Sequence, residues 1–191
     1  GAHVLGFANV DPKTAKILSG ITIKEPLITE VVFPPLDRSI TQQPGSIDVS
    51  MIADFSNVSA TAPTIKLPTQ ALPAWMTSDF TITIGNGTPS PNATSPITID
   101  VPRDSKSGAP IAKPTFGKPI HLYFPASALS AIDAWKKSKK GSNVKITYLS
   151  TTKSPLFDLV LQSCVPTTET FSGIVDTVVA CTSASFDVRF F

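Results

Sequence analysis

VKITYLSTTKSPLFDLVL, residues 144–161, contains two of the clearest strand patterns in this chain. Successive side chains of a β-strand point to opposite faces of its sheet, so apolar residues at every second position predict a half-buried strand. Both ends of the stretch follow this rule, with Val144, Ile146 and Tyr148 in the first part and Phe157, Leu159 and Leu161 in the last.

The same two-residue period recurs along the rest of the chain. It is found in Ile47, Val49, Met51 and Phe55; in Phe80, Ile82 and Ile84; in Ile97, Ile99 and Val101; in Ile120, Leu122 and Phe124; and in Phe186, Val188 and Phe190. The apolar runs Ile21–Ile23 and Ile28–Phe33 are further strand candidates. Proline, glycine and asparagine separate most of these runs, and the 18 prolines make long helices unfavourable. We therefore predict an all-β fold, an antiparallel β-sandwich or barrel of about 8–10 strands.

One short helix is predicted near residues 126–140. It begins near Pro125 and Ser127, it carries an apolar stripe of Leu129, Ile132 and Trp135, and Gly141 provides its stop. The interpretation we favour is a helix that closes one end or edge of the sandwich, and a partner-binding helix is the alternative. Four lysines lie at its end, where cations offset exposed carbonyl groups: Lys136, Lys137, Lys139 and Lys140.

The composition indicates a surface that is polar through hydroxyl groups instead of charges. Charged residues make up 16% of the 191, and the net charge is +2, whereas 43 residues are Ser or Thr. So small a charge excess gives no strong signal for a nucleic-acid partner. No apolar run approaches the roughly 18–20 residues of a transmembrane helix, so we expect no transmembrane segment.

The length fits one β-sandwich-like domain over residues 1–191. Within it we expect an apolar N-terminal arm at about residues 1–10. The segment at about residues 85–118, rich in Pro, Ser, Thr and Gly, is expected to form long surface loops around the short run 97–101.

Cys164 and Cys181 are the two cysteines, and 16 residues separate them. Two thiols with distant histidines do not make a four-ligand zinc site, so we predict no metal site. A disulfide between them would stabilise the folded state by about 3 kcal/mol in the chain-entropy model, because it closes a loop in the unfolded chain. A pair of buried free thiols is the alternative.

Groups for catalysis are sparse, and we predict no catalytic residue and no cofactor. The sequence holds no nucleophile elbow, zinc-protease helix, phosphate-binding loop or dinucleotide-binding fingerprint. His121 falls on the strand face opposite Ile120 and Leu122, which predicts an exposed or edge position. Asp158 and Asp187 alternate with apolar neighbours and are expected to face solvent.

Three sites match the Asn-x-Ser/Thr pattern of glycosylation acceptors: Asn57, Asn86 and Asn92. About one such match is expected by chance in a chain so rich in hydroxyl residues, so three is a mild excess. Trp75 follows a turn-like Leu-Pro-Ala sequence and is the candidate for stacking on a sugar ligand, although core packing is the interpretation we favour for it.

Both ends of the chain are apolar, which is unusual because chain ends normally fray in water. The residues concerned are Val4, Leu5, Phe7, Val10, Phe190 and Phe191. A terminal apolar strand can pack within its own domain or add to the sheet edge of a neighbour. These residues are our candidates for assembly arms, and they predict a homo-oligomer formed through terminal strands.

From these observations we expect a non-enzymatic structural subunit. It would self-associate into an extracellular or virus-like assembly such as a filament, tube or shell, and it would be located outside the cell or on a virion surface. A secreted adhesion or carbohydrate-binding module with a glycan or cell-surface partner is the first alternative. A hydrolase whose acid pair is not recognisable in the sequence is the second.

Overall fold

The computed structural model describes residues 4–10, 17–24, 26–53, 58–59, 74–85, 87–104 and 107–188. The chain forms two compact units. The first unit comprises Gly1–Val31, Val49–Leu72 and Val101–Lys113, and the second comprises Val32–Asp48, Pro73–Asp100 and Pro114–Phe191. The expectation of one sandwich-like domain over residues 1–191 stays a prediction.

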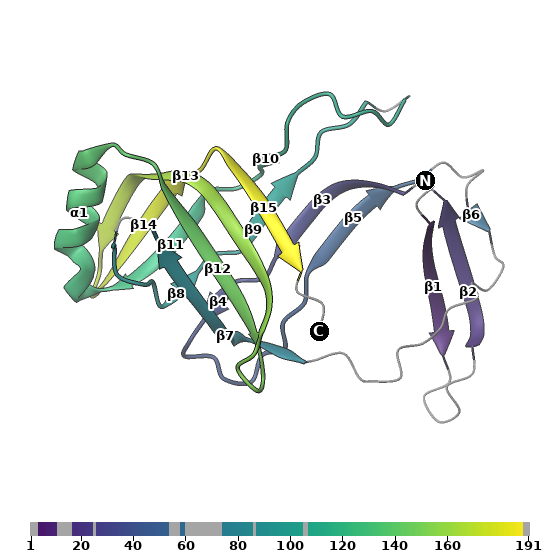
Figure 1. The fold of residues 1–191 in the computed structure, drawn as a ribbon, viewed down its shortest axis with the longest axis horizontal. Coiled ribbons are helices and arrows are strands. Elements are labelled where there is room, and N and C mark those ends of the chain that lie inside the picture. Colours follow the sequence, from purple (N-terminus) through teal and green to yellow (C-terminus); the bar gives the residue numbers. More distant parts are fainter. Residues whose placement is uncertain are drawn as a thin grey trace. The chain divides into compact units, whose positions relative to one another are not determined.

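The second unit is built on an antiparallel eight-stranded sheet (Figure 1). Seven strands follow the order β4-β8-β11-β14-β13-β12-β7, and β15 pairs with β13 beside this path. The end strands β4 and β7 contact each other, so the sheet curls into a nearly closed barrel. The strands are β4 (Leu36–Asp37), β7 (Trp75–Ile84), β8 (Ala93–Thr94), β11 (Ile120–Pro125), β12 (Ser142–Ser150), β13 (Pro155–Phe171), β14 (Ile174–Ala180) and β15 (Ser183–Val188). The predicted all-β fold with one short helix is confirmed.

The 17-residue strand β13 organises this sheet. Its first half pairs with β12 on one edge and with β15 on the other, and its second half pairs with β14. The register runs from Phe171↔Val175 to Val165↔Ala180 along β14 and resumes at Gln162↔Ser183 along β15. Strands β14 and β15 therefore follow β13 back as one long antiparallel partner that is interrupted at residues 181–182.

The core of the second unit follows the alternation expected from the sequence. The predicted apolar sets of β7, β11, β12 and β13 are all buried. Aromatic rings fill one part of this core, where Tyr148 stacks on Phe157 and the edge of Trp75 meets both rings. Phe186 of β15 departs from the expectation, because it lies at the margin of the core and stays about half exposed.

The helix is shorter than expected and ends differently. A 3-10 turn at Ala126–Ala128 leads into α1 (Leu129–Ser138), with Ile132 and Trp135 buried and Leu129 exposed. Gly141 was predicted as the stop, but Lys139 ends the helix with a left-handed φ of 51° and donates its N–H to the Lys136 carbonyl. Glycine at position 141 is favoured for another reason, since a Cβ there would lie only 3.0 Å from the Ser163 backbone.

The remaining strands form two smaller sheets. One has the order β1-β2-β6 and the other β10-β9-β3-β5. Their bounds are β1 (Val4–Val10), β2 (Ile17–Lys24), β6 (Val58–Ser59), β3 (Leu27–Phe33), β5 (Asp48–Ile52), β9 (Ile97–Asp100) and β10 (Thr115–Phe116). Strands β8, β9 and β10 are short and lie within the segment 85–118 that was expected to be rich in loops. The division between the two units runs through β3 and β5.

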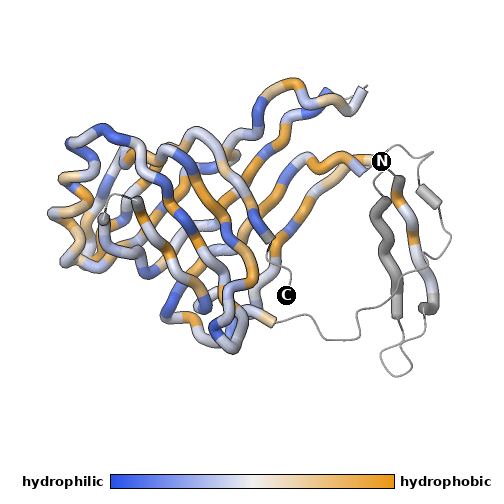
Figure 2. Tube along the Cα trace, viewed as in Figure 1, coloured by the Kyte–Doolittle hydropathy of each residue, from blue (hydrophilic) through white to orange (hydrophobic). Residues whose placement is uncertain are grey.

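The first unit has no buried side chain among the residues whose side chains the structure describes. Apolar stretches nevertheless run along β3 and β5 (Figure 2). The predicted burial of one face of β5 is wrong, because Val49 is exposed and Met51 is only half buried. Alternation indicates which residues share a face, but burial also needs a second layer against that face.

Candidate functional site

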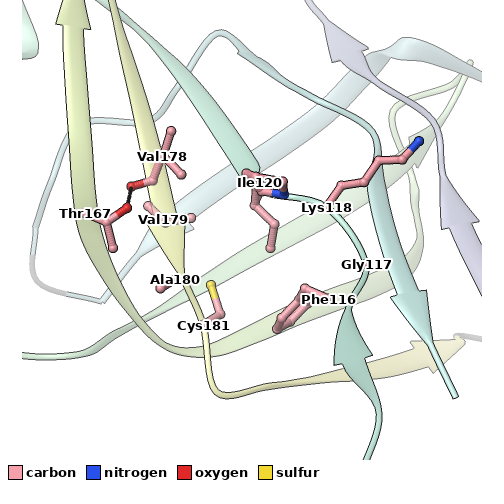
Figure 3. Close-up of a pocket in the computed structure, with 10 residues that line it drawn as sticks. Phe116, Gly117, Lys118, Ile120, Thr167, Val178, Val179, Ala180 and Cys181 are labelled. Carbon is pink, nitrogen blue, oxygen red and sulfur yellow. Dashed lines mark hydrogen bonds between the residues drawn. The ribbon is translucent and has the colours of Figure 1, made fainter. Parts of the chain in front are cut away.

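A cavity of about 450 Å³ opens beside the single disulfide of the chain (Figure 3). The connection from β10 to β11 forms one wall, and the end of β14 with one residue of β13 forms the other. The lining residues are Phe116, Gly117, Lys118, Pro119, Ile120, Thr167, Val178, Val179, Ala180 and Cys181. The cavity is therefore a notch at the point where β11 ceases to pair with β14.

The Cys164–Cys181 disulfide predicted from the sequence is confirmed. The two residues face each other in the gap between the pairs Val165↔Ala180 and Gln162↔Ser183, and their Cα atoms are 4.0 Å apart. Cys164 is buried, whereas Cys181 is half buried and lines the notch. The bond thus joins β13 to its long antiparallel partner at the interruption in that partner.

The chemistry of this notch is limited. Lys118 is the single ionisable side chain in its lining, and Figure 3 shows it extending away from the Cys181 sulfur. The Thr167 hydroxyl donates a hydrogen bond of 3.2 Å to the Val178 carbonyl. General acid–base catalysis needs a donor and an acceptor within reach of one reacting group, and these lining residues do not supply such a pair.

His121 lies in a polar cluster on the outer face of the barrel. Its Nδ1 lies 2.9 and 3.2 Å from the two carboxylate oxygens of Asp176, which comes from the neighbouring strand β14. Its ring also stacks on Tyr123, two residues along β11. Burial, and secondarily the Asp176 carboxylate, raises the pKa of the Tyr123 phenol. The exposed or edge histidine of the prediction is therefore a half-buried residue held by an acidic partner.

A second, more apolar cavity of about 300 Å³ adjoins this cluster. Tyr123 belongs to its lining, together with Pro35, Leu36, Asp37, Ile40, Gln43, Ala93, Thr94 and Ile174. Asp37 is the single carboxylate among these residues, and its Oδ1 already accepts hydrogen bonds from the Ser39 amide and hydroxyl. The phenol of Tyr123, the Gln43 amide and the Thr94 hydroxyl, which has no hydrogen-bond partner in the described part of the chain, remain as polar groups that could orient a ligand.

The predicted exposure of Asp158 is wrong, although Asp187 is exposed as expected. Asp158 is only 4% exposed, and its carboxylate accepts a 2.6 Å hydrogen bond from Thr147 and lies 3.0 Å from the Lys145 ammonium. Alternation places the Asp158 side chain on the outer face of β13, and side chains of the neighbouring strand β12 cover it there. The register sets Asp158 directly opposite Asp187, so the fold brings together two acids that the sequence left scattered. Neither acid lines the 450 Å³ notch or the 300 Å³ cavity described above.

Trp75 lies within the aromatic cluster of the second unit. Its ring centroid is 5.1 Å from that of Tyr148 and 5.6 Å from that of Phe157. Gly45 lies so close to the indole that a Cβ would overlap it. Its use as a sugar platform stays a prediction.

The other candidate residues fall into two groups. Asn92 is exposed in the loop before β8, where its backbone bonds to Tyr123 and Arg38, and its glycosylation stays a prediction. The remaining candidates lie outside the described residues, or have side chains outside them: Asn57, Asn86, Phe190 and Phe191, and the β1 residues Val4, Leu5, Phe7 and Val10.

Asp176 and Tyr123 are the residues that the sequence reasoning missed. Tyr123 shares the parity of His121, so an outward-facing histidine predicted an outward-facing tyrosine beside it. No signal in the sequence pairs Asp176 with His121, because strands β11 and β14 are 55 residues apart at this contact.

Within the described ranges, no group of three His, Cys, Asp or Glu side chains is placed to hold a metal ion. The helix in that part of the chain is also not long and apolar enough to cross a membrane.

Comparison with known proteins assigns the chain to no family. No protein-family model matches the chain, and no curated protein matches it. Among solved structures, the chain is similar to one described as a crystal structure of Hcp protein, with 11% sequence identity and a TM-score of 0.39. The match covers 58% of this chain and 98% of the other.

Proposed function

We propose that this chain is a non-enzymatic structural subunit that self-associates into an extracellular or virus-like assembly, such as a filament, tube or shell. The observation that carries the proposal is that the first unit has no buried side chain among the residues whose side chains the structure describes, although its parts of β3 and β5 are rich in apolar residues. A sheet normally buries one face against another layer, and a second copy of the chain can supply that layer.

Large apolar side chains are exposed on three described segments of the first unit. Ile28 of β3 is 41% exposed, Val49 and Ile52 of β5 are each 43% exposed, and Ile111 is 66% exposed. Large apolar side chains that gather on exposed strands are typical of surfaces that bind another protein.

Hydrogen bonds hold the chain around Ile111 in a defined conformation, so Ile111 is not exposed merely because its segment is loose. Arg103 donates hydrogen bonds to the Ile28 carbonyl at 2.8 Å and to the Gly108 carbonyl at 3.1 Å. The Val101 amide also bonds to the Thr29 carbonyl of β3 at 2.8 Å. A preformed apolar segment loses little conformational freedom on association, which favours a specific contact.

Two further observations support an extracellular setting and a structural role. A disulfide is typical of proteins that fold in an oxidising environment, and Cys164–Cys181 is such a bond. The described cavities do not combine an acid with a base, and the acids Asp158 and Asp187 lie outside them. We therefore assign the chain no catalytic role.

Sedimentation velocity over a wide concentration range, with electron microscopy of the concentrated sample, tests this proposal. We expect the wild-type chain to form oligomers as its concentration rises. Ile111→Ser should weaken this association about tenfold or more, because it removes a large apolar side chain from the contact.

Phe171→Ser is the matched control, since Phe171 is 59% exposed but belongs to the second unit. It should leave the association constant unchanged. A wild-type chain that remains monomeric at the highest concentration would contradict the proposal, and so would equal effects of the two substitutions.

A further inference from the structure

Strand β15 has an open edge. Six residue pairs join it to β13, from Gln162↔Ser183 to Phe157↔Val188. On the other side, β11 pairs with β14 only as far as Ile120↔Val179 and ends before β15 begins. The chain ahead of β11 turns away into β10, which pairs with β9, so no strand among the described residues pairs with the outer edge of β15.

We propose, on the basis of the proposed self-association, that this edge binds the same edge of a second copy in antiparallel register around a two-fold axis. An edge strand carries unpaired N–H and C=O groups that another strand can satisfy. Two-fold contacts are the commonest in homo-oligomers, and they require a surface that is complementary to itself. The side chains of β15 meet this requirement.

The register that we assign sets Ser185 opposite the partner's Ser185. Phe186 then lies opposite the partner's Ala184, and Asp187 lies opposite the partner's Ser183. Phe186 is then paired with a small side chain and Asp187 with a hydroxyl, and the central pair brings two serine hydroxyls together. A shift that set Asp187 opposite the partner's Asp187 would place like charges together, which destabilises a strand pair.

Phe186 explains why a partner strand would be bound on this edge. It lies across from the buried Leu159, its ring is 5.5 Å from Phe33 and 5.3 Å from Phe157, and it is still 46% exposed. A strand beside β15 would cover the exposed part of this ring. A small residue opposite Phe186 fits better than a second phenylalanine, because Phe33 and Phe157 already lie against the ring.

Charge substitutions at Ser185 test the contact directly. Ser185 is exposed in the single chain, so Ser185→Lys should fold normally, but in the dimer it sets two lysines opposite each other. We expect a rise of about tenfold or more in the dimer Kd, measured by sedimentation. Ser185→Asp should behave alike, and an equimolar mixture of the two variants should associate again. Ser130→Lys, the same change at an exposed position on α1, is the control and should not alter the Kd.

A cross-link tests the register. Directly opposed residues of antiparallel strands have Cα atoms about 4.5–5.5 Å apart, which is within the range of a disulfide. Ser185→Cys should therefore form a covalent dimer under mild oxidation. Asp187→Cys should not, because its two copies would lie about 13 Å apart along the strands.

The outcomes separate the inference from the proposed function. If the wild-type chain associates and Ser185→Lys associates equally well, the β15 contact is refuted and the proposed function stands. If the variant mixture fails to associate, or Asp187→Cys cross-links as readily as Ser185→Cys, the assigned register is wrong. If the wild-type chain never associates, both the proposed function and the contact fail.

Discussion

Removal of the Cys164–Cys181 disulfide should lower the free energy of unfolding by about 3 kcal/mol. The bond joins residues 17 positions apart, and in the chain-entropy model closing a loop of that size stabilises the folded state by about 3 kcal/mol. For a chain of this length, a loss of about 3 kcal/mol corresponds to a fall in Tm of roughly 6–12 °C. Urea unfolding followed by tryptophan fluorescence is the assay, because Trp75 and Trp135 both lie in the same unit as the disulfide.

Two perturbations separate the cross-link from the packing of its sulfur atoms. Reduction of the wild-type chain retains both sulfurs and removes only the bond. The double variant Cys164→Ala/Cys181→Ala also removes the buried sulfur of Cys164, which should add a further cost of about 1 kcal/mol for the space left behind. An increase in the urea m-value is expected in both, since the unfolded chain becomes less compact.

A reduced chain whose free energy of unfolding lies within about 0.5 kcal/mol of the oxidised one would refute this reasoning. That result would mean that the β13–β14 hairpin, with its register from Val165↔Ala180 to Phe171↔Val175, already constrains the unfolded ensemble without the bond.

Three further substitutions in the second unit have defined expectations. The Tyr148 hydroxyl is buried without a hydrogen-bond partner in the described part of the chain, so Tyr148→Phe should raise the free energy of unfolding by about 1 kcal/mol in urea titrations. Burial also raises the pKa of Tyr148 far above its ordinary value of about 10, so the folded state holds this proton more tightly. Wild-type stability should therefore fall as the pH rises above about 10, and that of the variant should fall less. Asp158→Ala leaves the Thr147 hydroxyl without its acceptor and should cost about 1–3 kcal/mol by thermal unfolding, whereas Asp158→Asn should cost less because it keeps an acceptor oxygen. Gly141→Ala places a Cβ against the backbone of β13 and should cost about 1–3 kcal/mol by the same measurement, whereas Gly85→Ala, whose Cβ would have 3.8 Å of room, should change stability by less than about 0.5 kcal/mol.

Local patterns predicted the elements of the second unit because alternation is a property of neighbouring residues. Val144, Ile146 and Tyr148 are buried as expected, and so are the matching sets of β7, β11 and β13. The disulfide was also predictable, since two cysteines a short loop apart have few alternatives. The helix was placed correctly, but its stop was not, because Lys139, and not Gly141, ends the helix in a left-handed conformation.

The candidate site was less predictable, because it depends on which strands become neighbours. His121 meets Asp176 only because β11 pairs with β14, and Asp158 faces Asp187 only because β15 pairs with β13. Asp158 was expected in solvent, since alternation indicates a face but not what covers it.

By itself, the sequence determined the strand periodicity, the short helix, the hydroxyl-rich surface and the cysteine pair, all of which follow from residue type and local spacing. The tertiary structure alone decided the order of the strands, the interruption between β14 and β15, the open edge that results, and the lack of burial among the described residues of the first unit. These features depend on contacts between residues far apart in the chain, and a local pattern carries no information about which distant strand will pair with it.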